Sequence, residues 1–112
     1  MSPDAPVLAC LADLPEGEPV AIETMLDGEA ESLILFREGD AVRAWRNVCP
    51  HAGRRLDWSP GKFLRAKDGT LVCAVHGASF ELRRGECVAG PCRGQSLGAV
   101  PTEVLDGQVV VR

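Results

Sequence analysis

The chain has only two histidines, and each follows closely after a cysteine. One residue separates Cys49 from His51, and two residues separate Cys73 from His76. Thiolate and neutral imidazole are common ligands of transition metals. The two pairs lie 21 residues apart, counted between His51 and Cys73. This pattern predicts a four-ligand metal site formed by Cys49, His51, Cys73 and His76.

Two kinds of metal centre use two cysteines and two histidines. Zinc fingers usually place a C-x2-4-C pair before an H-x3-5-H pair. Here each pair is mixed, and the first has a single residue between its ligands. A mixed pair suits a dinuclear cluster in which one iron is held by both cysteines and the other by both histidines. A [2Fe–2S] cluster therefore fits better, and a structural zinc ion remains the alternative.

Three segments of the sequence resemble Rieske-type iron–sulfur proteins, and the matching stretch runs from Asn47 to about Val111. The first cluster loop is matched by Cys49-Pro50-His51-Ala52-Gly53-Arg54-Arg55-Leu56 and the second by Val72-Cys73-Ala74-Val75-His76-Gly77-Ala78-Ser79-Phe80. Gly90-Pro91 resembles the proline-bearing loop that covers the cluster. The interval between the loops is longer than is common in the family, and residues 57–68 hold the extra length. The resemblance implies one [2Fe–2S] cluster per chain.

Departures from the family pattern indicate a low reduction potential. Arg54 and Val75 stand where high-potential members carry two further cysteines that form a disulfide. Ala78 and Phe80 replace the serine and tyrosine whose hydroxyls raise the potential in those members. Hydrogen bonds to the cluster stabilise its reduced, more negative state, so a protein with fewer of them stabilises that state less. The resemblance therefore implies a low-potential member with no loop disulfide.

All four ligand positions are filled by side chains, so a substrate would have no open position on the metal. We therefore interpret the chain as an electron carrier and not as an enzyme. The resemblance implies a soluble ferredoxin that passes single electrons from a flavin reductase to a terminal oxygenase. A small Rieske-type subunit or module of a reductase complex, such as nitrite reductase, is the alternative. We expect a monomer with no small-molecule substrate. Nucleic acid is not an expected partner, because the net charge is −4 and no binding motif is present.

Length and hydropathy predict one small domain. The 112 residues suffice for one hydrophobic core, and a bound cluster would add to the stability of so short a chain. We therefore expect a single Rieske domain over residues 1–112, with a cluster-binding subdomain at about 47–91. No apolar run approaches the roughly 20 residues that span a membrane. The apolar stretch from Val7 to Ala12 lacks the basic flank of a signal peptide, so a cytoplasmic location is expected.

Short apolar runs separated by turn residues predict an all-β chain. Strands are expected at residues 20–26, 32–36, 41–45, 71–73, 79–82, 99–105 and 108–111. Asp27-Gly28 and Asp106-Gly107 are typical of tight hairpin turns. The predicted fold is a Rieske-like antiparallel β-sandwich or barrel, with the cluster-binding loops as a small subdomain.

Three cysteines remain after the ligands are assigned: Cys10, Cys87 and Cys92. We expect buried, unreactive thiols, and a Cys87–Cys92 bridge is not favoured in a reducing compartment. Cys92 directly follows Gly90-Pro91, so it should lie close to the cluster. The aromatic side chains are expected to fill the core and anchor loops: Phe36, Trp45, Trp58 and Phe63. Phe80 would shield the cluster from water.

Charge is distributed unevenly along the sequence. Residues 1–42 contain ten acidic residues and one basic residue, Arg37. Residues 43–67 contain seven basic residues and one acidic residue, Asp57. Either this is a solvated, mixed surface, or the basic part steers the first cluster loop toward acidic partners.

Overall fold

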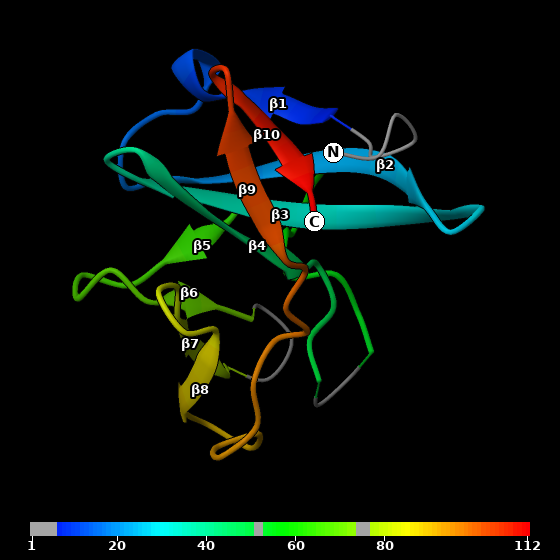
Figure 1. The fold of residues 1–112 in the computed structure, drawn as a ribbon. Helices are drawn as coiled ribbons and strands as arrows, with labels where there is room; N and C mark the ends of the chain where they lie inside the picture. Colours follow the sequence, from blue (N-terminus) through cyan, green and yellow to red (C-terminus); the bar gives the residue numbers. More distant parts are fainter. Residues whose placement is uncertain (1–6, 51–52, 74–76) are drawn as a thin grey trace.

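The computed structural model describes residues 7–50, 53–73 and 77–112. These residues form three antiparallel sheets and one short 3₁₀ helix (Figure 1). The elements in chain order are β1 (Val7–Cys10), the 3₁₀ turn η1 (Leu11–Asp13), β2 (Pro19–Leu26), β3 (Glu29–Glu38), β4 (Ala41–Arg46), β5 (Leu64–Arg65), β6 (Leu71–Val72), β7 (Ser79–Glu81), β8 (Glu86–Ala89), β9 (Thr102–Leu105) and β10 (Gln108–Val111). No helix in these ranges is long and apolar enough to cross a membrane.

The two Asp-Gly steps form tight hairpin turns, as the sequence predicts. Asp27 and Asp106 both adopt left-handed backbone conformations, with φ of 51° and 50°. Each is followed by a glycine that also has positive φ, the combination that a two-residue type I′ turn requires. The first turn joins β2 to β3, and the second joins β9 to β10. Both turns thereby set the register of the antiparallel pairs that they join.

Strand β3 separates two hydrophobic cores. Its inner residues are buried, and successive side chains point to opposite faces of a strand. Leu33 and Leu35 belong to a core shared with Val109 of β10, whereas Ile34 and Phe36 belong to a second core. The sheet β2-β3-β4 is thus covered on one face by β1-β10-β9 and on the other by β5-β6-β7-β8 (Figure 1).

The sheet β5-β6-β7-β8 is joined to β4 by a buried hydrogen bond. The Trp45 indole N–H donates to the carbonyl of Leu82 over 3.0 Å. Tyrosine and tryptophan need such a partner when buried, and Trp45 has one. This four-stranded sheet and its loops lie at the lower end of the molecule in Figure 1. It carries the second of the two predicted ligand segments, between β6 and β7.

The predicted all-β class is confirmed, and the strand expected at 108–111 is present with those bounds. Five others are present with shifted ends: those expected at 20–26, 32–36, 41–45, 71–73 and 79–82. The strand expected over 99–105 begins at Thr102, although Ala99 forms an isolated bridge with Trp45. Three short strands were not expected: β1, β5 and β8. Each is at most four residues long and has exposed positions, so it shows little hydrophobic alternation.

Candidate metal centre

The two predicted ligand segments have the same backbone hydrogen-bond pattern. The Cys49 N–H donates to the Arg54 carbonyl over 2.7 Å, and the Gly53 N–H donates to the Cys49 carbonyl over 2.8 Å. In the second segment, the Cys73 N–H donates to the Ala78 carbonyl over 2.7 Å, and the Gly77 N–H donates to the Cys73 carbonyl over 2.9 Å. Each cysteine thus begins a turn of equal length. The two segments form matching loops.

A glycine ends each of these loops in a left-handed conformation. Gly53 has φ of 67° and Gly77 has φ of 73°, values that side chains with a Cβ rarely adopt. The histidine-to-glycine spacing differs, with one residue between His51 and Gly53 and none between His76 and Gly77. The turn length counted from the cysteine is therefore the shared feature.

Both cysteines are buried in the same hydrophobic core. Cys49 is 0% exposed and Cys73 is 1% exposed, and both belong to the core that contains Phe80 and Leu71. Two thiol side chains, presented by equivalent turns from one core, fit the thiolate side of a [2Fe–2S] cluster. The chemistry of this pair supports the predicted cluster.

His51 and His76 lie outside the described residues, so their predicted role stays a prediction. Within 7–50, 53–73 and 77–112, no group of three or more His, Cys, Asp or Glu side chains is placed to hold a metal ion. This absence does not bear on the predicted site, because two of its four members lie outside those ranges.

The segment containing Gly90 packs against the second loop. A Cβ built on Gly90 would lie 2.8 Å from the Ala78 Cα and 3.2 Å from the Gly77 carbonyl oxygen, too close for any residue but glycine. Gly90 also has φ of 93°. The expectation that Gly90-Pro91 lies over the ligand loops is in keeping with this contact.

The remaining cysteines do not share one environment. Cys87 and Cys92 are buried in the same core as Cys49 and Cys73, and the Cys92 Sγ lies 2.8 Å from the Cys87 Sγ. Burial, reinforced by Cys87, raises the pKa of the Cys92 thiol to about 12. Cys10 is exposed, so the expectation of a buried thiol is wrong there. The reason is its position at the end of β1, a short edge strand.

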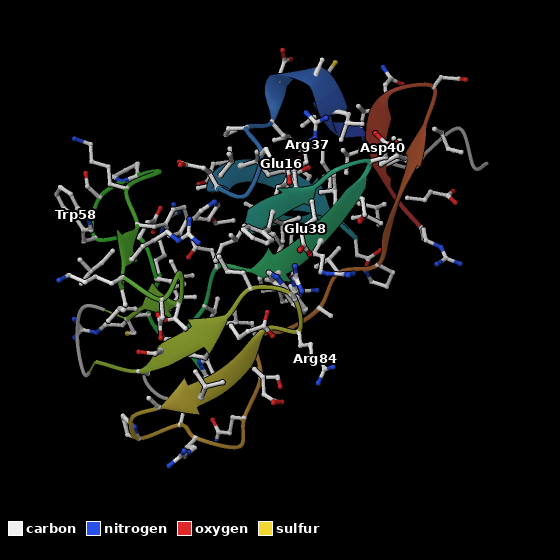
Figure 2. The ribbon with its side chains drawn as sticks, turned by 90° about the vertical axis from the view of Figure 1, so that its left-hand side faces the viewer. Glu16, Arg37, Glu38, Asp40, Trp58 and Arg84 are labelled. Carbon is white, nitrogen blue, oxygen red and sulfur yellow. The ribbon has the colours of Figure 1, made fainter. Side chains whose placement is uncertain are left out.

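Most aromatic residues fill the core as expected, but Trp58 does not. Phe36, Trp45 and Phe80 are buried, and the partly buried Phe63 packs against them. Phe80 is fully buried in the core that holds both candidate cysteine ligands, in keeping with a shielding role. Trp58 is 62% exposed and projects from the edge of the molecule (Figure 2). The prediction that Trp58 is a core or anchor residue is therefore wrong.

A buried polar network, not expected from the sequence, supports the first ligand loop. The side-chain oxygen of Asn47 accepts a hydrogen bond of 2.9 Å from the Leu56 N–H, and Asn47 is 1% exposed. The Asp57 carboxylate accepts two hydrogen bonds from Arg55, over 2.8 and 2.7 Å. Arg55, helped by the Gly61 N–H, lowers the pKa of Asp57 to about 2. Hydrogen-bonded polar side chains thus fix the backbone before and after the first ligand loop.

The acidic and basic halves of the sequence pair with each other in the fold. Arg46 lies 2.6 Å from Glu31, and Arg55 lies 3.1 Å from Glu23. Arg43 lies 3.5 Å from Glu38. Three of the seven basic residues in 43–67 are therefore neutralised by acids of the first 42 residues. Three other basic residues of this stretch are exposed: Arg54, Lys62 and Lys67.

Comparison with known proteins gives a family match over most of the chain. A sequence model of the Rieske [2Fe–2S] domain matches residues 5–106. The 3-phenylpropionate/cinnamic acid dioxygenase ferredoxin subunit of Shigella flexneri serotype 5b (strain 8401) is 31% identical over 106 residues, which are 94% of this chain and 91% of that protein. The anthranilate 1,2-dioxygenase ferredoxin subunit of Burkholderia cepacia is 29% identical, over 93% of this chain and 87% of that protein.

Solved structures give the same result for the fold. The ferredoxin of carbazole 1,9a-dioxygenase from Nocardioides aromaticivorans IC177 superposes with a TM-score of 0.72 and 28% identity, covering 96% of this chain and 95% of that chain. The terminal oxygenase of carbazole 1,9a-dioxygenase from Novosphingobium sp. KA1 gives a TM-score of 0.75 at 24% identity, but only 29% of that chain is covered. The same fold thus occurs in a ferredoxin and within a larger oxygenase chain.

Proposed function

Because the chain belongs to the Rieske [2Fe–2S] domain family, we propose that it passes single electrons from a flavin reductase to a terminal oxygenase. Membership of the family assigns it one [2Fe–2S] cluster, and it is an electron carrier of a dioxygenase-type system rather than an enzyme. The observation that carries the proposal is the pair of matching loops, each beginning at a buried cysteine of one core.

Cys49, His51, Cys73 and His76 are the proposed ligands. Two thiolates would hold one iron and two imidazoles the other, so the oxidised centre carries no net charge from its core and ligands. A neutral centre accepts an electron more readily than a four-thiolate centre with a double negative charge. Rieske centres accordingly have potentials of roughly −150 to +300 mV, against roughly −400 mV for plant-type ferredoxins.

Iron analysis of single variants tests this ligand set. Cys49→Ser, Cys73→Ser, His51→Ala and His76→Ala should each abolish cluster assembly and reduce iron from about two atoms per chain to almost none. Cys10→Ser is the matched control, because it removes an exposed thiol outside the core that holds Cys49 and Cys73, and it should retain full iron. A colourless wild-type protein with one zinc ion per chain would refute the cluster and establish the zinc alternative.

The direction of electron flow is supported by the relatives that this chain covers over most of their length. Those relatives are named ferredoxin subunits of dioxygenases. Reconstitution provides the test. When the purified chain is mixed with a flavin reductase and a terminal oxygenase, the mixture should oxidise NADH and form hydroxylated product. Omitting the chain should remove that activity, whereas equal activity with and without it would contradict the proposal.

We also propose a potential at the low end of the Rieske range. Ala78 and Phe80 are fully buried beside the candidate ligands, and neither side chain can donate a hydrogen bond to the cluster. Without such donors the reduced state gains less stabilisation. Protein-film voltammetry should give a midpoint near or below roughly −100 mV, within the range known for such centres. A strongly positive midpoint would contradict this.

The remaining expectations are kept as proposals. Residues 1–112 are proposed to act as one Rieske domain with a cluster-binding subdomain at about 47–91, in a monomer located in the cytoplasm. The exposed charges of Arg54, Lys62 and Lys67 are proposed to steer association with an acidic partner. Association rates that do not change between low and high ionic strength would refute this steering.

A further inference from the structure

Trp58 is the most exposed large hydrophobic side chain among the described residues. It is 62% exposed, and Figure 2 shows it at the outer edge of the molecule. Single exposed apolar residues are common in monomeric proteins, so exposure alone indicates no function. The backbone and the charges around Trp58 supply the further evidence.

The turn that carries Trp58 has a fixed shape. Residues 58–62, here called the Trp58 turn, are closed by two backbone hydrogen bonds: the Trp58 N–H donates to the Lys62 carbonyl over 2.9 Å, and the Lys62 N–H donates to the Ser59 carbonyl over 2.7 Å. The Gly61 N–H also donates to the Asp57 carboxylate over 3.0 Å. A side chain on such a turn loses little backbone entropy when it binds a partner.

The Trp58 turn is connected to the first ligand loop through buried groups. The Asp57 side chain, only 1% exposed, holds the turn through Gly61 and is itself held by Arg55. The preceding residue, Leu56, is buried and donates its N–H to Asn47, two residues before Cys49. The position of the indole is therefore set by the same groups that set the position of the first candidate ligand.

The exposed charge on and beside the Trp58 turn is positive. The Lys62 Nζ lies 5.4 Å from the centre of the Trp58 ring, a distance at which cation–π attraction holds the two side chains together. Arg54, in the first ligand loop, is also exposed. Two carboxylates pair with Arg55: Asp57 is buried, and the exposed Glu23 lies 3.1 Å from the guanidinium. A complementary surface would offer an apolar pocket for the indole, bordered by carboxylates.

We propose that the Trp58 turn is the docking anchor for the electron acceptor, with Trp58 entering an apolar pocket of a terminal oxygenase and Lys62 facing carboxylates at the rim of that pocket. This inference rests on the proposed function. The acceptor is chosen over the reductase because relatives of this chain are ferredoxin subunits of dioxygenases. Tryptophan is among the residues that dominate the energy of protein interfaces, and neighbouring charges then set orientation and association rate.

Electron transfer from the reduced holoprotein tests the proposal. The acceptors are the purified terminal oxygenases of the 3-phenylpropionate/cinnamic acid and anthranilate dioxygenases, because their ferredoxin subunits are relatives of this chain. Stopped-flow mixing measures the dependence of the transfer rate on oxygenase concentration. Trp58→Ala should raise the half-saturating concentration about tenfold or more, as expected for a central interface residue. Trp58→Phe should recover most of that loss.

Two controls separate docking from damage to the cluster. Ferricyanide needs no protein docking, so its reduction by Trp58→Ala should proceed at the wild-type rate, with an unchanged midpoint potential. Arg84→Ala removes an exposed basic residue that lies away from Trp58 in Figure 2, below and right of the centre, and it should leave transfer to the oxygenase unchanged.

Lys62 variants test the charge component. Lys62→Ala should lower the association rate about threefold at low salt and reduce its dependence on ionic strength, and Lys62→Glu should lower the rate further. In every Trp58 and Lys62 variant, reduction of the chain by the reductase should change less than electron transfer from the chain to the oxygenase. A larger effect on the reductase step would overturn the assignment to the acceptor.

Three further outcomes would be decisive. If wild type transfers electrons to an oxygenase and Trp58→Ala does so equally well, the docking proposal is wrong and the proposed function stands. If wild type transfers to neither oxygenase, both fail. If sedimentation shows a wild-type dimer that Trp58→Ala dissociates, the surface belongs to a second copy of the chain and the docking proposal is overturned.

Discussion

Gly90 lies directly against the backbone of Ala78, the residue that accepts the hydrogen bond from the Cys73 N–H. A Cβ built on Gly90 would be 2.8 Å from the Ala78 Cα and 3.1 Å from the Ala78 nitrogen. Backbone atoms cannot move away as the end of a flexible side chain can. The segment that follows β8 can therefore lie against the second ligand loop only because Gly90 has no side chain.

Gly90→Ala should loosen this contact and make the cluster more labile. Gly94→Ala is a closely matched control, because Gly94 has the same φ of 93° but nothing within 4 Å of the added Cβ. Both variants place an alanine at positive φ, so both carry that backbone strain. Only in Gly90→Ala does the added Cβ also overpack against the Ala78 backbone, which costs about 1–3 kcal/mol. The melting temperature should fall about 5–10 °C more for Gly90→Ala. Iron release to a chelator at equal rates in both variants would contradict the proposed contact.

Cys10 should be the only fast-reacting thiol of the folded holoprotein. Cys10 is exposed, whereas Cys87 and Cys92 are buried and burial raises the pKa of Cys92 to about 12. A thiol must ionise before it attacks a disulfide reagent. Titration with a colorimetric disulfide should therefore modify about one thiol quickly in wild type and almost none in Cys10→Ser. Rapid modification of a second thiol in the native protein would show that the Cys87–Cys92 pair is accessible.

Asp57→Asn should change the acid stability of the protein. Arg55 lowers the pKa of the folded Asp57 from 3.8 to about 2, so the carboxylate stabilises the fold above about pH 4. This contribution is lost as the pH falls from about 4 to about 2, because the group protonates in the unfolded chain first. It amounts to at most about 2 kcal/mol. Denaturation curves of wild type and Asp57→Asn should therefore converge at low pH.

The exposed variant Glu103→Gln serves as the control for Asp57→Asn, since it removes one carboxylate without touching the network around Arg55. Its stability difference from wild type should stay almost constant over the same pH range. A constant difference for Asp57→Asn as well would show that the pairing with Arg55 contributes nothing to stability.

Ala78→Ser should raise the reduction potential. Ala78 is 0% exposed and ends the second ligand loop, where a hydroxyl could donate to the cluster. A hydrogen bond that favours the reduced state by about 1.4 kcal/mol shifts a one-electron potential by about 59 mV. Ala44→Ser, buried in the other core, controls for the cost of burying a hydroxyl and should leave the potential unchanged. Equal potentials in all three proteins would refute the predicted hydroxyl effect.

The features that could be predicted from the sequence are those encoded by short, strict patterns. Asp27-Gly28 and Asp106-Gly107 allow few backbone conformations, so both hairpins were predictable. The two Cys-His pairs carry the family resemblance, and the family match over residues 5–106 confirms it. The ligand assignment itself stays a prediction, because His51 and His76 lie outside the described residues.

The features that could not be predicted depend on contacts between distant residues. Strand β1 forms because Ala9 and Cys10 pair with β10, about a hundred residues later in the chain, and nothing local marks it. The support of the first loop depends on one hydrogen bond between Asn47 and Leu56. Trp58 was expected in the core because tryptophan is large and apolar, yet the short turn that Asp57 holds places it in solvent.

Strand β3 gives Leu33 and Leu35 to one interior and Ile34 and Phe36 to the other. Cys49 and Cys73, the two proposed ligands that the structure describes, both lie outside the interior shared with β10. A descendant of this protein that had mutated its ligands would therefore keep the core formed around Leu33, Leu35 and Val109. Such a protein would no longer transfer electrons, but it would still fold around this core, and the sheet β1-β10-β9 could acquire another function.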